Sequence, residues 1–150
     1  LVLMGTFLFY LLWPLVWFYA PLARRARVVI INSGKVLVVK NSFGPGVWQL
    51  PGGGIKFRES PVDAAKRELL EELNLELKTP ALLSNEVRIV KQFGLLMRYQ
   101  FVSGSVVDSK KLQSNAEIVE WKWLDYGSNF ENEQIATEVR IGVKLAIDKG

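Results

Sequence analysis

The chain of 150 residues contains neither cysteine nor histidine. The lack of cysteine excludes disulfides, thiolate nucleophiles and zinc–thiolate sites. The lack of histidine removes the commonest general base and a common metal ligand. Any catalysis must therefore depend on carboxylates, lysine, tyrosine, serine or a metal-bound water.

Charge is also absent from the first 23 residues, so the rest of the chain carries all 19 basic and all 15 acidic side chains. The formal net charge of +4 is modest and spread out, and it gives no strong reason to expect a nucleic-acid partner. The length suits one domain with a real core. We therefore expect a single domain over residues 24–150, preceded by a separate apolar segment.

The uncharged residues 1–23 are long enough to cross a bilayer, for which about 20 apolar residues suffice. Pro14 would kink a helix, which membrane helices tolerate better than soluble ones. Aromatic residues of the kind found near membrane interfaces also occur here: Tyr10, Trp13, Trp17 and Tyr19. The segment predicts a transmembrane anchor over residues 1–23.

Three arginines follow this run at once: Arg24, Arg25 and Arg27. By the positive-inside tendency they hold the following domain on the cytoplasmic side. A cleaved signal peptide is one alternative, but it would carry its positive charges before the apolar run and a small-residue cleavage site after it. A buried helix of the domain is another, but a helix that is apolar all round offers no face to solvent.

Beyond the apolar run, β-branched stretches alternate with turn residues, which is typical of strands. Residues 27–31 and 35–40 flank Asn32, Ser33 and Gly34 and predict a hairpin. The other expected elements are short strands over 47–50, 87–90, 95–102 and 117–124, a polar connection over 106–114, and a closing helix over 132–148.

A further helix has a well-marked start and end. Ser60 suits the N-cap, Pro61 the first helical position, and Asp63 a capping-box-like place. Asn74 tolerates the left-handed conformation that ends a helix. The apolar stripe expected to pack on the sheet consists of Val62, Ala65, Leu69 and Leu73.

The opposite face of this helix is acidic. Glu68, Glu71 and Glu72 share an arc of about 100°, behind a glycine run at 52–54 and Glu59. Two unit charges 4 Å apart repel by about 4 kcal/mol at an effective dielectric near 20, and Mg²⁺ or Mn²⁺ would relieve this repulsion. Glycine lets the backbone approach a metal or a phosphate closely. The segment predicts a divalent-metal site that handles phosphates.

The same glutamates also fit an ordinary solvated helix face. Arg67 would then form surface pairs with Asp63 and Glu71 at i,i+4 spacing, and the like-charge cost in solvent would be a few tenths of a kcal/mol. The helix alone leaves both interpretations open, and its conjunction with the glycine run favours the metal site.

The segment resembles the signature of the Nudix hydrolases. The matching positions, in order and spacing, are Gly53, Glu59, Arg67, Glu68, Leu69, Glu71, Glu72 and Leu75. Asn74 stands where the family has glycine, and asparagine also accepts that geometry. Residues 48–53 and 117–123 resemble the family's lead-in to the signature and its late acidic, aromatic strand. The resemblance implies an α/β (α+β) fold, with a mixed, curved sheet sandwiched between helices.

The resemblance also implies hydrolysis of a nucleoside diphosphate linked to another group, X, with Mg²⁺ or alternatively Mn²⁺. It assigns the metal site to Gly53 (through its carbonyl), Glu59, Glu68, Glu71 and Glu72, of which Glu68 or Glu71 acts as base. Arg67 would orient a glutamate. Glu117 is a candidate distal ligand or base, against the simpler interpretation of a solvent-facing strand residue.

Several points stay open at this level. The candidates for base stacking are Phe43, Phe57, Phe93, Tyr99 and Trp121, although an aromatic residue in a strand is more often core. X is not readable from the sequence. A catalytically inactive module that binds and senses a nucleotide is the alternative function, and the presence of every signature glutamate favours the enzyme. The oligomeric state is not readable from the sequence; a homodimer is one alternative, since family members are often dimers.

Overall fold

The computed structural model describes residues 2–19, 22–107, 113, 115–127, 130–131 and 133–150. Its elements are α1 (Val2–Leu11), α2 (Trp13–Tyr19), β1 (Arg24–Val29), β2 (Ile31–Asn32), β3 (Lys35–Asn41), α3 (Pro61–Leu73), β4 (Leu77–Leu82), β5 (Arg88–Gln92), β6 (Leu95–Val106), β7 (Ile118–Asp125) and α4 (Thr137–Lys149). Most of the expected connection over 106–114 lies outside the described residues, as does Asn132. Residues 133–136 precede α4 without being helical, so the closing helix begins later than expected.

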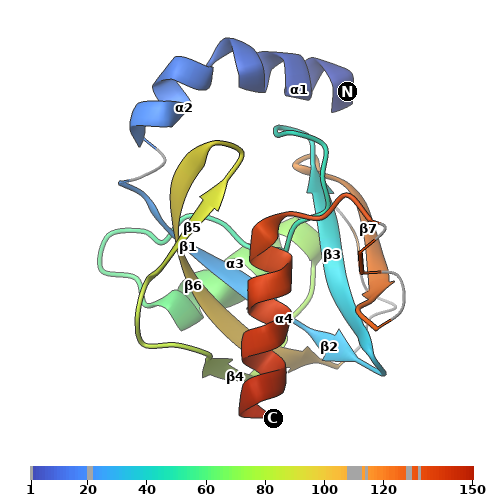
Figure 1. Cartoon of the computed structure of the whole chain (residues 1–150). Helices are drawn as coiled ribbons and strands as arrows, with labels where there is room; N and C mark the ends of the chain where they lie inside the picture. Colours follow the sequence, from blue (N-terminus) through green and yellow to red (C-terminus); the bar gives the residue numbers. More distant parts are fainter. Residues whose placement is uncertain (1, 20–21, 108–112, 114, 128–129, 132) are drawn as a thin grey trace.

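The strands form two sheets. In the first, β6 pairs in parallel with β1 and antiparallel with β4 and β5, whereas the second is the antiparallel set β2-β3-β7. Helices α3 and α4 lie on opposite sides of the strands (Figure 1). This arrangement is the mixed-sheet α/β fold between helices that the sequence predicted.

The expected hairpin is only partly present. The two-residue strand β2 pairs with β3 across a turn at Ser33 and Gly34, where both residues have positive φ angles of 49° and 77°. Strand β1 instead begins at Arg24 and runs parallel to β6, from Arg24 opposite Arg98 to Val29 opposite Ser103. The prediction was wrong for β1 because its parallel partner lies far along the chain, where local turn signals carry no information.

Strand β4 was not expected. Its sequence, LKTPAL, contains a proline, which removes a ladder hydrogen bond and confines a strand to a sheet edge or a bulge. Here β4 lies at the end of the strand order, and its pairing with β6 is irregular between Lys78 and Ala81.

Helix α3 has the predicted caps. The Ser60 side chain accepts a hydrogen bond from the Asp63 N–H at 3.1 Å, and Asn74 ends the helix in the left-handed conformation with φ 54°. On the apolar stripe, Ala65, Leu69 and Leu73 are buried and Val62 packs beside them. The caps and the stripe fix which face of α3 meets the sheet.

The N-terminal segment forms two short helices instead of one. Helices α1 and α2 have 10 and 7 residues, or about 15 and 10 Å, against about 30 Å of bilayer hydrocarbon. The break falls at Leu12, and Pro14, which has no N–H, lies in the first turn of α2. In the part of the chain that the structure describes, no helix is long and apolar enough to cross a membrane. The expected single transmembrane helix over residues 1–23 is therefore not observed. Trp17 and Tyr19, two of the aromatic residues expected near a membrane interface, have side chains that the structure does not describe.

Candidate active site

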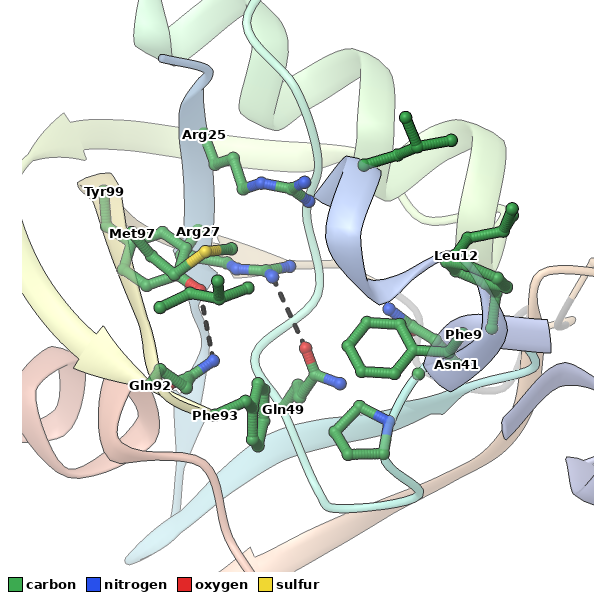
Figure 2. Close-up of a pocket in the computed structure, with 15 residues that line it drawn as sticks. Phe9, Leu12, Arg25, Arg27, Asn41, Gln49, Gln92, Phe93, Met97 and Tyr99 are labelled. Atoms are coloured by element: carbon green, nitrogen blue, oxygen red, sulfur yellow. Dashed lines mark hydrogen bonds between the residues drawn. The ribbon is translucent and has the colours of Figure 1, made fainter. Parts of the chain in front are cut away.

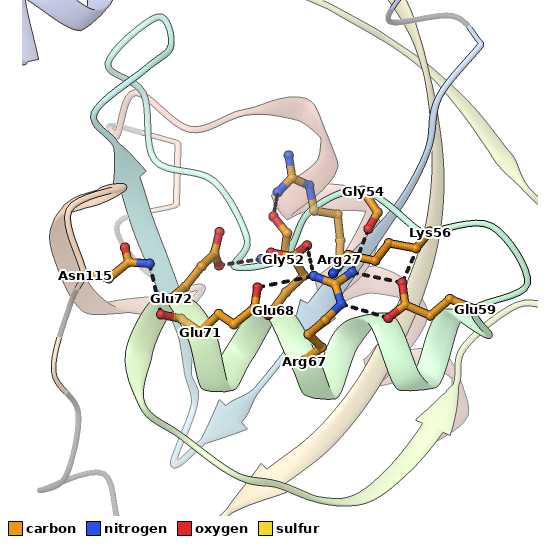
Figure 3. A network of polar contacts seen from close by, with 10 residues as sticks. All are labelled: Arg27, Gly52, Gly54, Lys56, Glu59, Arg67, Glu68, Glu71, Glu72 and Asn115. Carbon is orange, nitrogen blue, oxygen red and sulfur yellow. Dashed lines mark hydrogen bonds and ion pairs between the residues drawn. The ribbon is translucent and has the colours of Figure 1, made fainter.

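Arg67 lies at the centre of the acidic face of α3 (Figure 3). Its guanidinium donates to both carboxylate oxygens of Glu59, at 2.8 and 2.9 Å. It also donates to Glu68 at 2.6 Å, to Glu71 at 3.3 Å and to the Gly54 carbonyl at 3.0 Å. Arg67 thereby links the helix, the residue before it and the glycine run, which suits the predicted orienting role.

Glu59 is committed to this arginine. The hydrogen bonds from the Arg67 guanidinium, and then the one from the Lys56 N–H at 2.8 Å, lower the pKa of Glu59 to about 2. The hydrogen bond to Glu59 likewise raises the pKa of Arg67 above its ordinary value. The pair therefore stays charged at neutral pH, and Glu59 acts on the site through Arg67.

Glu72 is the buried member of the glutamate cluster, with 4% of its surface exposed. Its carboxylate accepts a hydrogen bond from the Gly52 N–H at 2.9 Å. Burial raises the pKa of Glu72 to about 7; the charges of Glu68 and Glu117 add to the rise, and the Gly52 N–H and the charge of Arg27 oppose it. Repulsion among these carboxylates makes the cluster a place where a cation would be stabilised.

Gly53 leaves the space that one of these carboxylates fills. A Cβ at this position would lie 2.6 Å from the carboxylate carbon of Glu68, so no larger residue fits without displacing Glu68. The Gly53 carbonyl accepts a hydrogen bond from the Ala26 N–H at 2.9 Å, which ties it to β1. Its role as a metal ligand stays a prediction.

Among the described residues, no three carboxylates are arranged so that they could hold a metal ion. The cause is visible in the contacts: Arg67 draws Glu68 and Glu71 toward its guanidinium, and Glu72 is turned toward the Gly52 N–H. The donor set nevertheless fits Mg²⁺, which keeps several waters and needs only one or two carboxylates. Glu68 and Glu72 meet this requirement, because both carboxylates lie against the glycine run.

Glu117 reaches the cluster through a residue that sequence reasoning missed. The Asn115 side-chain amide donates to the Glu71 carbonyl at 2.9 Å, and its backbone N–H donates to the Glu72 carbonyl at 3.0 Å. The same side chain accepts from the Glu117 N–H at 2.8 Å. Asn115 thus fixes the exposed Glu117 beside the C-terminal end of α3. The sequence signal that could have indicated this role is the tendency of asparagine side chains to bond to nearby backbone groups.

Arg27 has a role quite different from the expected one. It is 3% exposed and donates to Glu138 at 3.1 Å, so it is not a membrane-flanking charge. Its guanidinium also donates to the Gly52 carbonyl at 2.7 Å and the Leu50 carbonyl at 3.2 Å. Burial disfavours its charge, but Glu138, Tyr99 and Glu72 together outweigh this effect and raise the pKa of Arg27. Arg27 therefore fixes the strand that leads into the glycine run.

Glu138, in the first turn of α4, completes this buried network. Its carboxylate accepts from the Leu50 N–H at 3.2 Å and from the Gln92 amide at 3.4 Å. Gln92 in turn donates to the Tyr99 hydroxyl at 3.1 Å. The sequence analysis did not foresee this pair, because β1 and α4 each carry several charged residues and nothing local marks the two that are buried.

A pocket of about 330 Å³ is lined by Arg27, the residue that donates to the Gly52 carbonyl (Figure 2). Three of the five predicted stacking residues line it, namely Phe43, Phe93 and Tyr99. The other two do not, and Phe57 and Trp121 are instead exposed. The polar groups in its wall include Arg27, Asn41 and Gln49.

Comparison with known proteins agrees with the family that the signature residues of α3 indicate. A family model described as the NUDIX domain matches residues 21–140. The chain belongs to the Nudix hydrolase family. Helices α1 and α2 lie before the matched range.

Relatives and solved structures extend this result. An RNA pyrophosphohydrolase of Ruthia magnifica subsp. Calyptogena magnifica is 26% identical over 125 residues, covering 70% of this chain and 69% of the relative. The MutT Nudix hydrolase of Burkholderia pseudomallei superposes with a TM-score of 0.66 at 20% identity, over 82% of this chain and 96% of that one. The Nudix domain of Shewanella oneidensis NrtR, solved with ADP ribose, superposes with a TM-score of 0.68 at 19% identity. The match covers 84% of this chain and 86% of that one. At these identities the structures establish the Nudix fold.

Proposed function

We propose that this Nudix domain hydrolyses the diphosphate linkage of a nucleoside diphosphate joined to another group, using Mg²⁺ or Mn²⁺. The observation that carries the proposal is the placement of the Glu68 and Glu72 carboxylates against the glycine run. Burial raises the pKa of Glu72 to about 7, and the charges of Glu68 and Glu117 add to this rise. Such a cluster is costly unless a cation neutralises it.

Each residue has a distinct task in this proposal. Glu68, Glu71 and Glu72 would hold the metal, which would neutralise charge on the phosphates and make a water more acidic. Glu68 or Glu71 takes the proton of the attacking water. Arg67, fixed by Glu59, keeps the glutamate side chains in place. The relative named as an RNA pyrophosphohydrolase and the neighbour that binds ADP ribose support a phosphate-linked nucleoside as substrate.

The test is product release from a panel of nucleoside triphosphates, nucleotide sugars and dinucleoside polyphosphates. We expect turnover with Mg²⁺ and none with a chelator, and a fall of at least about 100-fold in kcat/KM for Glu71→Gln. Glu76→Gln, outside the signature, serves as the matched control and should behave as wild type. Equal turnover by Glu71→Gln would remove the metal-site assignment. Binding without turnover by wild type would favour the alternative function, a nucleotide-sensing module. The oligomeric state is a separate question, and this experiment does not test it.

We further propose that residues 1–23 hold the domain, residues 24–150, at the cytoplasmic face of a membrane. The supporting observation is a set of exposed large apolar side chains outside the pocket described above: Met4, Phe7, Leu8, Tyr10, Leu11, Phe18 and Leu22. Exposed patches of this kind mark interaction surfaces. Arg24 follows them exposed, and all 15 acidic residues of the chain come after residue 58. An apolar helix face beside cations suits a pair of helices lying in the interface of an anionic leaflet.

Vesicle flotation of the full chain tests this proposal. We expect recovery with phosphatidylcholine–phosphatidylglycerol vesicles, weaker recovery with pure phosphatidylcholine, and loss of recovery for the Phe7→Ser/Phe18→Ser variant. Wild-type protein that stays in the aqueous fraction with both vesicle types would refute the proposal.

A further inference from the structure

We propose that the inner side of the α1–α2 helix pair is the roof of the substrate pocket and that it packs on a nucleobase. The inference rests on the proposed function for the identity of the substrate, whereas the roof itself follows from the contacts below. Helices α1 and α2 lie outside the range that matches the Nudix domain, so the family match itself says nothing about this wall.

The roof is built from apolar side chains that turn inward from exposed helices. Phe9 is 8% exposed, whereas Phe7, two residues earlier on the same helix, is 70% exposed. The Phe9 ring meets the Phe43 ring edge-on, with centroids 5.4 Å apart. Leu12 and Leu15 line the same pocket (Figure 2). The helix pair therefore presents one face to the pocket and the other to the surroundings.

Two loops that flank the pocket hold the roof in place. A Cβ at Gly5 would collide with the Ser42 carbonyl oxygen, so α1 approaches the loop after β3 more closely than another residue would allow. At the opposite side, the Trp13 ring packs 3.9 Å from the position that a Cβ at Gly94 would take, at the tip of the β5–β6 hairpin. The roof thus spans the pocket from one loop to the other.

The pocket combines flat apolar walls with polar groups. Phe9, Phe43 and Phe93 all line the pocket, which suits a planar ring because aromatic side chains stack on bases. The Asn41 side-chain oxygen is buried and accepts no hydrogen bond from the described residues. Asn41 lines the pocket, and a base with an amino group offers the donor that its oxygen lacks, whereas an alkyl chain offers none.

The position of the pocket relative to the carboxylates suits the rest of a nucleotide. Gly52 separates them: its carbonyl accepts from Arg27, which lines the pocket, and its N–H donates to Glu72. Gly52 thus contacts both Arg27 in the pocket wall and Glu72 in the glutamate cluster. The phosphates of a nucleotide whose base lies under the roof would therefore extend toward this cluster. The geometry assigns the base to the pocket and the diphosphate to the glycine run.

Calorimetric titration of the full chain with nucleoside 5′-monophosphates tests the roof independently of catalysis, because these probes contain no diphosphate bond. Ribose 5-phosphate is the probe without a base. We expect wild type to bind at least one monophosphate, and ribose 5-phosphate to bind at least about tenfold more weakly. Phe9→Ser should weaken the monophosphate by about tenfold, and Phe9→Leu by less. Phe7→Ser, the matched control on the outer face, should bind as wild type.

Each other outcome overturns the inference. An equal loss of affinity for the monophosphate in Phe9→Ser and Phe7→Ser would show a general effect on the helices. Unchanged affinity in both variants would show that the roof does not touch the ligand. Equal affinity for ribose 5-phosphate, or no binding of any probe, would remove the base from the pocket. If the affinities follow the expected order but no diphosphate substrate is hydrolysed, the roof stands and the proposed enzymatic function falls.

Discussion

The Glu72→Gln variant is expected to lose at least about 100-fold in kcat/KM and yet, without metal, to be more stable than wild type at alkaline pH. Both effects have one cause. The Glu72 carboxylate is buried near the charges of Glu68 and Glu117. This environment stabilises a bound cation, and without a cation it destabilises the charged carboxylate. Glutamine keeps an oxygen for the Gly52 N–H but carries no charge.

The pH dependence follows from the direction of the shift. The pKa of Glu72 rises in the folded state from 4.5 to about 7, so the folded chain binds more protons than the unfolded chain between these values. The stability of metal-free wild type therefore falls as pH rises through this window, by on the order of 3 kcal/mol, and the variant escapes this loss.

Thermal unfolding with a chelator at pH 4 and pH 8 measures the difference. We expect Glu72→Gln to exceed wild type in Tm at pH 8 and to match it at pH 4. Added Mg²⁺ should raise the Tm of wild type more than that of the variant. Glu76→Gln, which lies outside the cluster, is the control. An equal difference in Tm at both pH values would contradict the assigned environment of Glu72.

Removing one member of the Arg27–Glu138 pair is expected to lower the free energy of unfolding by about 3–5 kcal/mol, because the other charge is left buried without its partner. The side chains are 3% and 0% exposed, so water cannot replace the lost contact. Total stabilities of domains lie near 5–15 kcal/mol. The expected loss is therefore a large part of the whole.

Urea unfolding of Arg27→Met, Glu138→Leu and the double variant forms the required cycle. The double variant should be more stable than the sum of the single losses predicts, since it removes both charges together. Lys122→Met, which breaks the half-exposed pair with Glu133, is the control and should cost about 1 kcal/mol or less. Additive losses in the cycle would show that the two side chains do not depend on each other.

The parts of the site that could be predicted are those specified by neighbouring residues. The caps at Ser60 and Asn74, the stripe of α3 and the spacing of its glutamates are local features, and the structure reproduces the helix they define. Arg27 and Glu138 are 111 residues apart, so no local pattern joins them. Arg27 was consequently assigned to the cluster of charges after the apolar run, although the fold buries it.

The N-terminal segment shows a different limit. Its lack of charge predicted one transmembrane helix, but the described residues form two short helices that are too short to cross a membrane. The proline at position 14 falls where a helix can start, so the chain divides into α1 and α2. Phe9 then faces inward while its neighbour Phe7 faces outward, a distinction that exists only once the helices lie on the domain.

Gly52 accepts a hydrogen bond from Arg27 on one side and donates one to Glu72 on the other. Through Arg27 it is connected to Glu138 on α4, and through Glu72 to α3, on the far side of the strands (Figure 1). Glycine has little conformational preference of its own, so these two bonds determine its orientation. The first turn of α4 and the acidic face of α3 therefore belong to one cooperative unit: a local opening that frees Glu138 also releases the backbone that holds Glu72.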